Sequence, residues 1–197
     1  MNYNDNQQLK LAQDFVLHTN RNVFLTGKAG TGKTTFLHNL RISTPKRMVV
    51  VAPTGVAAIN AGGVTIHSFF QLPFSPFIPG SQLLNQSNDD SQRFVHKLSK
   101  NKIKIIRSLD LLIIDEISMV RADLLDAIDD MLRRYRRTEK PFGGVQLLMI
   151  GDLHQLAPVI KEDEWSLIRS FYKSSYFFDS LALQKTDFTT IELKHIY

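Results

Sequence analysis

The sequence predicts an α/β domain in which a mostly parallel sheet carries helices on both faces. Three observations support this fold class. Short apolar runs alternate along the chain with segments of helical periodicity. Most of these runs are continuously apolar, which is typical of parallel strands buried on both faces. A glycine-rich segment at residues 27–34 lies between a predicted strand and a predicted helix, where such sheets bind their ligands.

The first quarter of the chain predicts helix, strand, helix and strand in that order. Apolar side chains at helical spacing indicate an amphipathic helix at residues 8–18. The apolar run 22–26 predicts a strand, a glycine-rich turn follows it at residues 27–32, and residues 33–40 form the next predicted helix. The valine-rich run 48–52 predicts a second buried strand.

Glycine and proline delimit the elements expected between the second and third strands. Thr54 is the predicted N-cap of a short helix at residues 55–61, and two glycines directly after it are expected to end that helix. Three prolines within residues 72–80 favour an extended loop. Residues 81–91 are polar and are expected to be mobile, so we expect a surface insertion or loop region over residues 72–100.

The second half of the chain continues the alternation of helix and strand. Residues 94–106 are apolar and basic and predict a helix, after which residues 111–115 predict the third buried strand. Leucine and isoleucine side chains mark one face of a charged helix at residues 123–137. The later elements are a strand at residues 145–150, a helix at residues 165–172 and a final strand at residues 188–193.

Length and composition set limits on the class of protein. The 197 residues, of which 43% are hydrophobic, are enough for one well-packed domain spanning residues 1–197. The net charge of +5 favours a polyanionic partner without identifying one. The absence of cysteine excludes disulfides, thiolate metal sites and cysteine nucleophiles, and it favours an intracellular protein. No apolar run is long enough to cross a bilayer and no secretory signal is evident, so we expect no membrane association.

The glycine-rich segment fits the pattern G-x-x-x-x-G-K-[ST] of a phosphate-binding loop without deviation. Its residues are Gly27, Lys28, Ala29, Gly30, Thr31, Gly32, Lys33 and Thr34. Glycines let backbone N–H groups close around phosphate oxygens, and the following helix adds the positive end of its dipole. Lys33 is expected to reach the β- and γ-phosphates and the Thr34 hydroxyl to bind Mg²⁺. We therefore predict that the segment binds ATP with Mg²⁺ and is not a glycine-rich turn without function.

An acidic pair directly after the third predicted strand supplies the second part of such a site. The apolar strand places Asp115 at the edge of the sheet, beside the phosphates. We expect Asp115 to hold Mg²⁺ through water and Glu116 to polarise the attacking water as a general base. An acidic pair after a strand is common in itself, and the phosphate-binding loop is what favours the functional interpretation. The adjacent Glu116 favours hydrolysis over transfer of the phosphoryl group to a small molecule.

A third polar segment, Gly151 to Gln155, follows the predicted strand at residues 145–150. A glutamine at the edge of a sheet can form hydrogen bonds with both a γ-phosphate and a water molecule. Gln155 is therefore a candidate sensor of hydrolysis. On spacing alone, the segment is equally well interpreted as an ordinary polar loop.

Taken together, these motifs resemble the first RecA-like domain of a superfamily-one DNA helicase, of the petite-integration-frequency (Pif) type and related to the RecD-like group. The resemblance implies a RecA-like P-loop NTPase fold. The strings APTGVAA and DEISM are specific, whereas the phosphate-binding loop by itself is not. The matching segments are GKAGTGKTT (27–35), APTGVAA (52–58), GGVTIHSFF (62–70), LLIIDEISM (111–119) and GDLHQLAP (151–158).

The resemblance implies ATP-driven movement along single-stranded DNA with 5′ to 3′ polarity, and roles in DNA repair, recombination and telomere maintenance. It implies that Lys33, Asp115, Glu116 and Gln155 are catalytic, and that Thr34 and Asp115 hold the metal. It adds Thr35 to the nucleotide-binding loop, and Gln8 as a contact of adenine, with Gln7 as the alternative. The strand contacts that it implies are Pro53, Thr54, Gly55, His67, Ser68 and Phe69.

Physical reasoning leaves two readings open at the aromatic strand contacts. Phe69 or Phe70 could stack on a base, which contributes about 1–3 kcal/mol per base in single-strand binders. Each is equally well interpreted as a core residue. Thr54 and Gly55 begin a helix whose N–H groups could take a phosphate.

A complete helicase of this type has two RecA-like domains with ATP between them, and the second supplies arginines to the γ-phosphate. We expect that second domain C-terminal to Tyr197. The chain by itself is expected to be an intracellular monomer, either cytoplasmic in a bacterium or DNA-associated. We expect it to bind nucleotide, to hydrolyse it slowly and not to unwind duplex. The alternatives are a nucleotide-gated single-strand binder with negligible turnover and a P-loop small-molecule kinase, which would have no use for APTGVAA.

Overall fold

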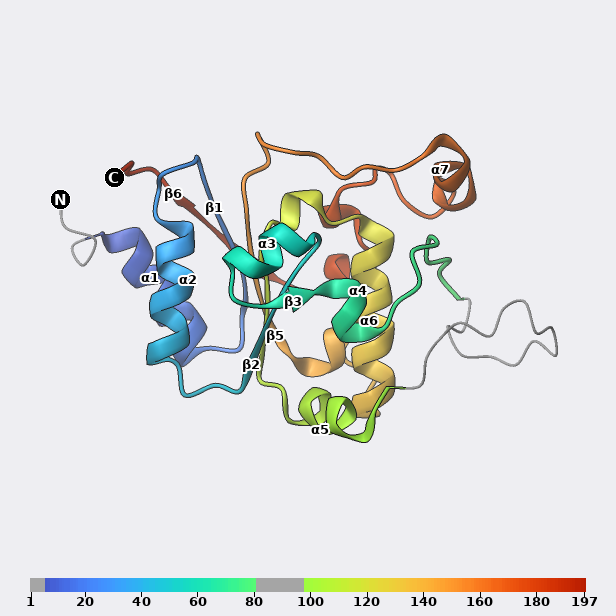
Figure 1. Ribbon diagram of the computed structural model, residues 1–197, viewed down its shortest axis with the longest axis horizontal. Coiled ribbons are helices and arrows are strands. Elements are labelled where there is room, and N and C mark those ends of the chain that lie inside the picture. The colour runs from blue at the N-terminus through green and yellow to red at the C-terminus, as the bar shows by residue number, and fades with distance from the viewer. Residues whose placement is uncertain (1–5, 81–97) are drawn as a thin grey trace.

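The structure is a computed structural model that describes residues 6–80 and 98–197. Its centre is one six-stranded sheet in the order β3-β2-β4-β5-β1-β6, in which every neighbouring pair of strands is parallel (Figure 1). This arrangement confirms the predicted α/β class. The strands are β1 (Asn22–Gly27), β2 (Met48–Ala52), β3 (Val64–Thr65), β4 (Leu111–Ile114), β5 (Gln146–Gly151) and β6 (Phe188–Leu193).

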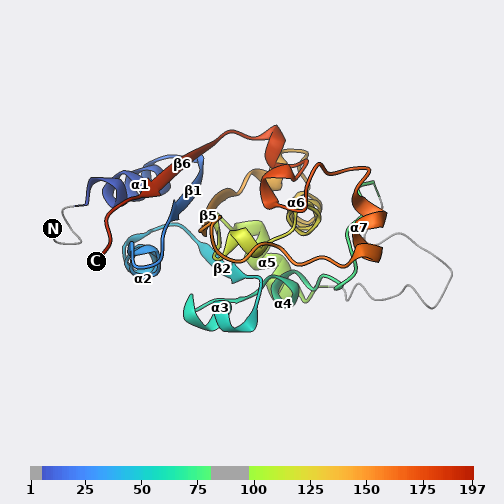
Figure 2. The ribbon, with the colours of Figure 1, turned by 90° about the horizontal axis from the view of Figure 1, so that it is seen from above.

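Helices cover both faces of the sheet, and Figure 2 shows the two layers from above. The described helices are α1 (Gln7–His18), α2 (Lys33–Ser43), α3 (Gly55–Asn60), α4 (Ile66–Phe70), α5 (Lys100–Ser108), α6 (Ala122–Arg136) and α7 (Glu162–Ile168). Helices α1 and α2 pack on one face, while α4, α5 and α6 pack on the other. No helix in either described range is long and apolar enough to cross a membrane.

Strand β4 has a continuous apolar sequence because its side chains enter the cores on both faces of the sheet. Leu111 and Ile113 join the cluster of buried side chains on the α1–α2 face, and Leu112 and Ile114 join the cluster on the α6 face. Successive side chains of a strand point to opposite faces, so a central strand covered on both sides needs an apolar residue at every position. All four side chains are fully buried.

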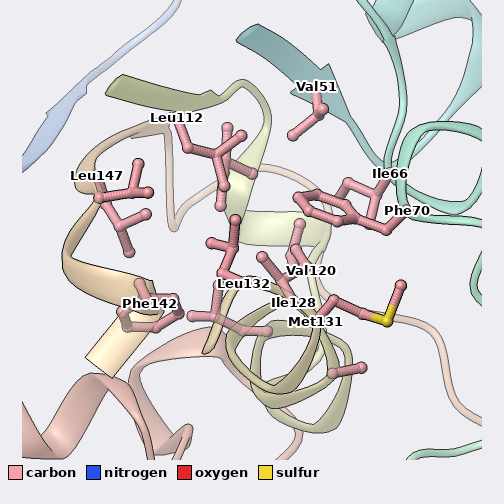
Figure 3. Packing of buried hydrophobic residues seen from close by; sticks show 14 of the residues in the cluster. Val51, Ile66, Phe70, Leu112, Val120, Ile128, Met131, Leu132, Phe142 and Leu147 are labelled. Atoms are coloured by element: carbon pink, nitrogen blue, oxygen red, sulfur yellow. The ribbon is translucent and has the colours of Figure 1, made fainter. Parts of the chain in front are cut away.

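Helix α6 packs against the sheet and contributes to the larger of the two main clusters of buried side chains. Figure 3 shows Ile128 and Leu132 of this helix directed toward Leu112 and Leu147 of the sheet, with Phe142 closing one side. Each of these side chains is fully buried. Burying a leucine, isoleucine or phenylalanine side chain contributes roughly 1.5–3 kcal/mol, so this contact fixes the helix under β4 and β5.

The structure contains two short elements that the sequence did not predict, β3 and α4. Residues 64–65 form β3 at the edge of the sheet, and residues 66–70 form the short helix α4. The Thr65 side chain caps α4 by accepting a hydrogen bond from the Ser68 N–H at 3.2 Å. A two-residue strand has no measurable period, so only pairing with β2 reveals it.

Two predicted helices have different bounds in the structure. The helix predicted at residues 94–106 begins at Lys100, because Ser99 is its N-cap; residues 94–97 lie outside the described ranges, as do residues 81–91, which were expected to be mobile. The helix predicted at residues 165–172 runs from Glu162 to Ile168. Three acidic residues fill its first turn, where negative side chains are stabilised by the helix dipole.

Candidate functional site

The carboxyl ends of three adjacent strands bring the predicted nucleotide-site residues together. Strands β4, β5 and β1 are neighbours in the sheet. The glycine-rich loop follows β1, Asp115 and Glu116 follow β4, and the segment from Asp152 to Gln155 follows β5. Ligands of parallel α/β sheets bind beyond these strand ends. The three motifs therefore meet at the place that the fold class predicts.

The glycine-rich loop has a backbone that side chains would obstruct. Gly30 and Gly32 have φ angles of 79° and 89°, in the left-handed region that favours glycine. At Gly27 a Cβ atom would lie 2.7 Å from the carbonyl oxygen of Leu193 and 2.8 Å from Thr31 Oγ1. Helix α2 begins at Lys33 with no side-chain cap, so its first N–H groups are available to a phosphate.

Lys33 folds back over the glycine-rich loop. Its Nζ donates hydrogen bonds to the carbonyl oxygens of Gly27 and, at 3.0 Å, of Lys28. Burial lowers the pKa of Lys33, and the negative charges of Asp152, Glu116 and Asp115 oppose that shift. A cation surrounded by carboxylates at the end of a P-loop is placed to bind the phosphates of a nucleotide.

Asp115 is the most perturbed acid of this site. Its half-buried carboxyl has a pKa raised to about 6, first by burial and then by the charge of Glu116, while the Glu116 N–H and the Lys33 charge act in the opposite direction. The Asp115 N–H donates to the Val51 carbonyl at 2.9 Å, which fixes the turn after β4 against β2. Glu116 then takes a left-handed φ of 51°, an uncommon conformation for a side chain of this size.

The oxygen donors at this edge suit Mg²⁺. Asp115 offers a carboxylate, and the exposed Thr34 offers a hydroxyl in the first turn of α2. Mg²⁺ prefers oxygen ligands and is usually held by one or two carboxylates together with substrate phosphates. A cation beside Asp115 would also favour the ionised carboxylate, against the burial that raises its pKa. The residues present therefore fit the predicted metal.

Asp152 is a member of this site that the sequence motifs did not single out. It is buried, and its carboxylate accepts hydrogen bonds at 3.0 Å from both the His154 N–H and the Gln155 Nε2. Burial would raise the pKa of Asp152, but these two hydrogen bonds and the charge of Lys33 outweigh it and lower the pKa. The exposed Gln155 is thus held at the mouth of the site by an acid that also faces Lys33.

The last residues of the chain link Gln8 to the glycine-rich loop. Its Oε1 accepts a hydrogen bond from the Lys194 N–H at 3.1 Å, and the Tyr197 N–H donates to the Gly30 carbonyl at 3.0 Å. Asn6, which was not predicted, caps α1 and donates to the Tyr197 hydroxyl at 3.1 Å. These contacts favour Gln8 over the exposed Gln7 as the residue next to the nucleotide.

Three of the six predicted strand contacts line a separate cavity. Pro53, Thr54 and His67 line a cavity of about 350 Å³ next to α3 and α4. The Thr54 hydroxyl accepts from the Ala57 N–H at 3.2 Å, which confirms the predicted N-cap. Ser68 is exposed, and its carbonyl accepts from Lys102 Nζ at 2.6 Å.

Phe69 and Phe70 are core residues in the structure. They are 7% and 0% exposed, and their rings meet edge to face with centroids 4.8 Å apart. Figure 3 shows Phe70 directed toward Val120 and Ile128. The structure therefore favours the core interpretation of both rings over base stacking, and it does not bring Phe69 to the cavity beside His67. An apolar residue on a five-residue helix has no periodicity that could have decided this from sequence.

Comparison with known proteins yields one family. The family model described as PIF1-like helicase matches residues 2–189. The chain is 37% identical over 186 residues to the ATP-dependent DNA helicase PIF1 of Candida albicans, covering 89% of this chain and 19% of that protein. It is also 37% identical over 194 residues to the ATP-dependent DNA helicase PIF1 of Danio rerio, covering 96% of this chain and 27% of that protein.

Solved structures give the same result. A crystal structure of Bacteroides Pif1 bound to ssDNA matches with a TM-score of 0.87 and 45% identity, over 97% of this chain and 42% of that chain. Bacteroides Pif1 in complex with ADP-AlF3 and ssDNA matches with a TM-score of 0.88. This chain therefore spans less than half of the length of these relatives.

Proposed function

The chain belongs to the PIF1-like helicase family, and we propose that it is an ATP-hydrolysing motor domain that binds Mg-ATP and single-stranded DNA. The observation that carries the proposal is the meeting of three motifs at adjacent strand ends, where Lys33 is surrounded by Asp152, Glu116 and Asp115. A solved relative holds ADP-AlF3 together with ssDNA, which supports both ligands.

We assign the nucleotide chemistry to residues at this edge. The loop from Gly27 to Thr35 holds the phosphates, Lys33 neutralises their charge, and Thr34 and Asp115 hold Mg²⁺. When bound, that ion neutralises the charge that develops on the phosphates. Glu116 accepts a proton from the attacking water.

Gln155 completes this set as the residue that responds to the γ-phosphate. Its Nε2 lies 3.0 Å from Asp152 Oδ2, at the exposed mouth of the site. An amide that can exchange this partner for a phosphate oxygen or a water molecule links the state of the nucleotide to the loop after β5.

The strand site of this proposal consists of Pro53, Thr54, Gly55, His67 and Ser68. Gly55 and Ser68 are exposed, and Lys102 adds a positive charge at the Ser68 carbonyl. Backbone N–H groups and hydroxyls of this kind bind phosphates without reading sequence. We also propose that the motor moves along the strand from 5′ to 3′, as the family resemblance implies.

We expect slow hydrolysis by the 197-residue chain alone and no unwinding of duplex DNA. The charges that act on Lys33 are those of three carboxylates. An arginine that stabilises the transition state accelerates related NTPases by about 10³–10⁵. We propose that such an arginine is supplied by a second RecA-like domain on the other side of the nucleotide.

The test measures the rate of phosphate release from Mg-ATP with water as the only acceptor. It compares this rate in the presence and in the absence of single-stranded DNA. A rate that rises with the strand supports the motor proposal. The alternative function is a nucleotide-gated strand binder with negligible turnover. Strand affinity that changes with Mg-ATP in the absence of phosphate release would favour that alternative, and robust unwinding by the monomer would contradict the expected slow hydrolysis.

A further inference from the structure

The cavity beside His67 has an aromatic side chain at its rim that no motif includes. Phe74 is 82% exposed and is the most exposed phenylalanine within residues 6–80 and 98–197. Its ring stacks on His67, with ring centroids 4.6 Å apart and an interplanar angle of 22°. A large apolar ring that stays this exposed is available to a ligand.

The loop that carries Phe74 is fixed on both sides of it. Leu72 and Phe77 are buried in the main core at 7% and 9% exposure. The Phe77 N–H donates to Asp123 Oδ2 at 3.0 Å, and Asp123 is itself only 1% exposed. The ring is therefore presented from a segment that the fold holds in place, which lowers the conformational entropy lost on binding.

The walls of the cavity suit an uncharged planar group. Leu72, Pro73, Phe77, Leu124 and Ala127 line it, and its volume of about 350 Å³ is at the small end of ligand sites, which span roughly 300–1,000 Å³. These five side chains offer van der Waals contact, and the polar lining residues Thr54, His67, Ser75, Arg121 and Asp123 add hydrogen-bonding groups.

The one cation of the cavity is already neutralised. Arg121 donates to Asp123 at 2.7 and 2.9 Å and to Glu164 Oε2 at 2.9 Å. Burial acts first to lower the pKa of Arg121, but these two carboxylates raise it overall, so the guanidinium remains charged and paired. The cavity therefore lacks the unpaired positive charge that a phosphate site needs.

We propose that this cavity receives one unpaired base of the DNA strand, whose ring stacks on Phe74 with His67 supporting the opposite face. The proposal rests on the strand-binding part of the proposed function and names the residue that contacts the base. Thr54 and His67 line the same cavity, so a strand with its backbone on the predicted contacts has a base within reach. Burial lowers the pKa of His67, with the charge of Arg121 acting in the same direction, which keeps the supporting imidazole uncharged near neutral pH.

The test measures the affinity of the chain for a fluorescent oligothymidine by anisotropy at fixed low salt. Phe74→Ala should weaken binding about 5- to 150-fold, the factor that corresponds to one lost stacking contact. Phe74→Trp should restore it. The dependence of affinity on salt should stay the same, because no phosphate contact is removed.

Two controls separate stacking from general damage. Phe188→Ala removes another exposed phenylalanine, on β6 at the opposite edge of the sheet, and should leave strand affinity unchanged. A strand with abasic sugars should bind the wild-type chain and Phe74→Ala equally. Because Phe74 is exposed, the variant should also retain the melting temperature and the Mg-ATP affinity of the wild type.

The outcomes distinguish this inference from the proposed function. Wild-type binding with no loss in Phe74→Ala would overturn the inference alone, as would an equal loss on the abasic strand. A wild-type chain that binds no strand would overturn both this inference and the strand-binding part of the proposed function.

Discussion

In the proposed nucleotide site, we expect binding to depend most on the ammonium group of Lys33. It is half-buried, and the charges that act on it come from three carboxylates. Nucleotide phosphates would add negative charge at the same point. We therefore expect this group to bind the phosphates, whichever nucleoside is attached.

Replacing Lys33 by alanine should weaken Mg-ATP binding roughly 10- to 150-fold, because a hydrogen bond to a charged group contributes about 1.5–3 kcal/mol. Isothermal titration calorimetry measures this change. Lys28→Ala is the matched control, since Lys28 lies in the same loop with an exposed side chain. Equal losses in the two variants would contradict the assignment of Lys33.

His67 should make folding stability depend on pH. Burial, and then the charge of Arg121, lowers its pKa below the ordinary value of 6.5, while Asp123 acts in the opposite direction. The folded chain therefore takes up a proton on His67 less readily than the unfolded chain. This contribution to stability is present above pH 6.5 and is lost as pH falls through the folded-state pKa.

In thermal unfolding, wild-type melting temperature should fall more than that of His67→Gln between about pH 7.5 and about pH 5. The difference between the two chains isolates His67 from the carboxyl groups that titrate in the same range. Parallel curves for wild type and variant would show that His67 does not titrate differently in the folded state.

At the scale of single residues, prediction from sequence succeeded where a motif is local. The glycine-rich loop is a run of eight residues whose geometry follows from its own composition, so its place at the end of β1 could be predicted. Phe69 and Phe74 could not be told apart in this way. Which ring is buried depends on the distant residues that pack against each, such as Asp123 holding the Phe77 N–H.

Close approach of backbones at the sheet edge makes one glycine indispensable between α3 and β3. A Cβ atom on Gly63 would lie 2.3 Å from the carbonyl oxygen of Val50, which is part of β2 and cannot move aside cheaply. At Gly55, the first residue of α3, a Cβ atom would meet nothing within 4 Å. Two glycines in one short segment thus have different structural roles.

Gly63→Ala should destabilise the chain by about 1–3 kcal/mol, the usual cost of forcing extra volume into a packed site. Gly55→Ala should leave stability unchanged or raise it by up to about 1 kcal/mol, because alanine is the better helix former. Urea unfolding of both variants measures these changes. A neutral Gly63→Ala would mean that β2 and β3 are not held as closely as the structure shows.

A buried acid ties the C-terminal segments to α6. Asp126 is 6% exposed and accepts four hydrogen bonds. The donors are the hydroxyls of Tyr172 and Ser180 and the N–H groups of Leu181 and Ala182. These contacts join residues more than forty positions apart, so no local pattern of the sequence could have predicted them.

Asp126→Ala should destabilise folding by at least about 3 kcal/mol, because each charge-assisted hydrogen bond contributes roughly 1.5–3 kcal/mol and buried donors lose their acceptor. Denaturant unfolding gives the value. Asp14→Ala, at an exposed position of α1, is the control and should change stability by less than about 0.5 kcal/mol. A loss of stability no larger than that of the control would show that the hydrogen bonds to Asp126 do not hold the C-terminal segment to α6.

Elements with long apolar runs could be predicted from sequence, whereas short ones could not. Strands β1, β2 and β4 to β6 have five predicted counterparts. A buried central strand such as β4 must be apolar throughout, whereas β6, at the edge of the sheet, is partly exposed. β3 has only two residues and α4 only five, so pairing and packing define them. The start of α5 at Lys100 was decided by a single capping residue, Ser99.

At the scale of the whole molecule, the two proposed sites lie beyond different strands of one sheet. The glycine-rich loop follows β1, while the cavity beside His67 lies at the β2–β3 side of the sheet. The loop after β5 reaches from Gln155 at the nucleotide site to Val159 at the cavity. Residues 155–159 therefore run from one proposed site to the other.

The measurement that tests the central proposal most directly is phosphate release from Mg-ATP by the wild-type chain and by Glu116→Gln under single-turnover conditions. Both chains should bind Mg-ATP with similar affinity. The wild-type chain should release phosphate slowly, and the variant at least about tenfold more slowly, because a general base contributes roughly 10²–10⁴ in rate. Equal release by the two chains, or no binding of Mg-ATP by either, would contradict the account.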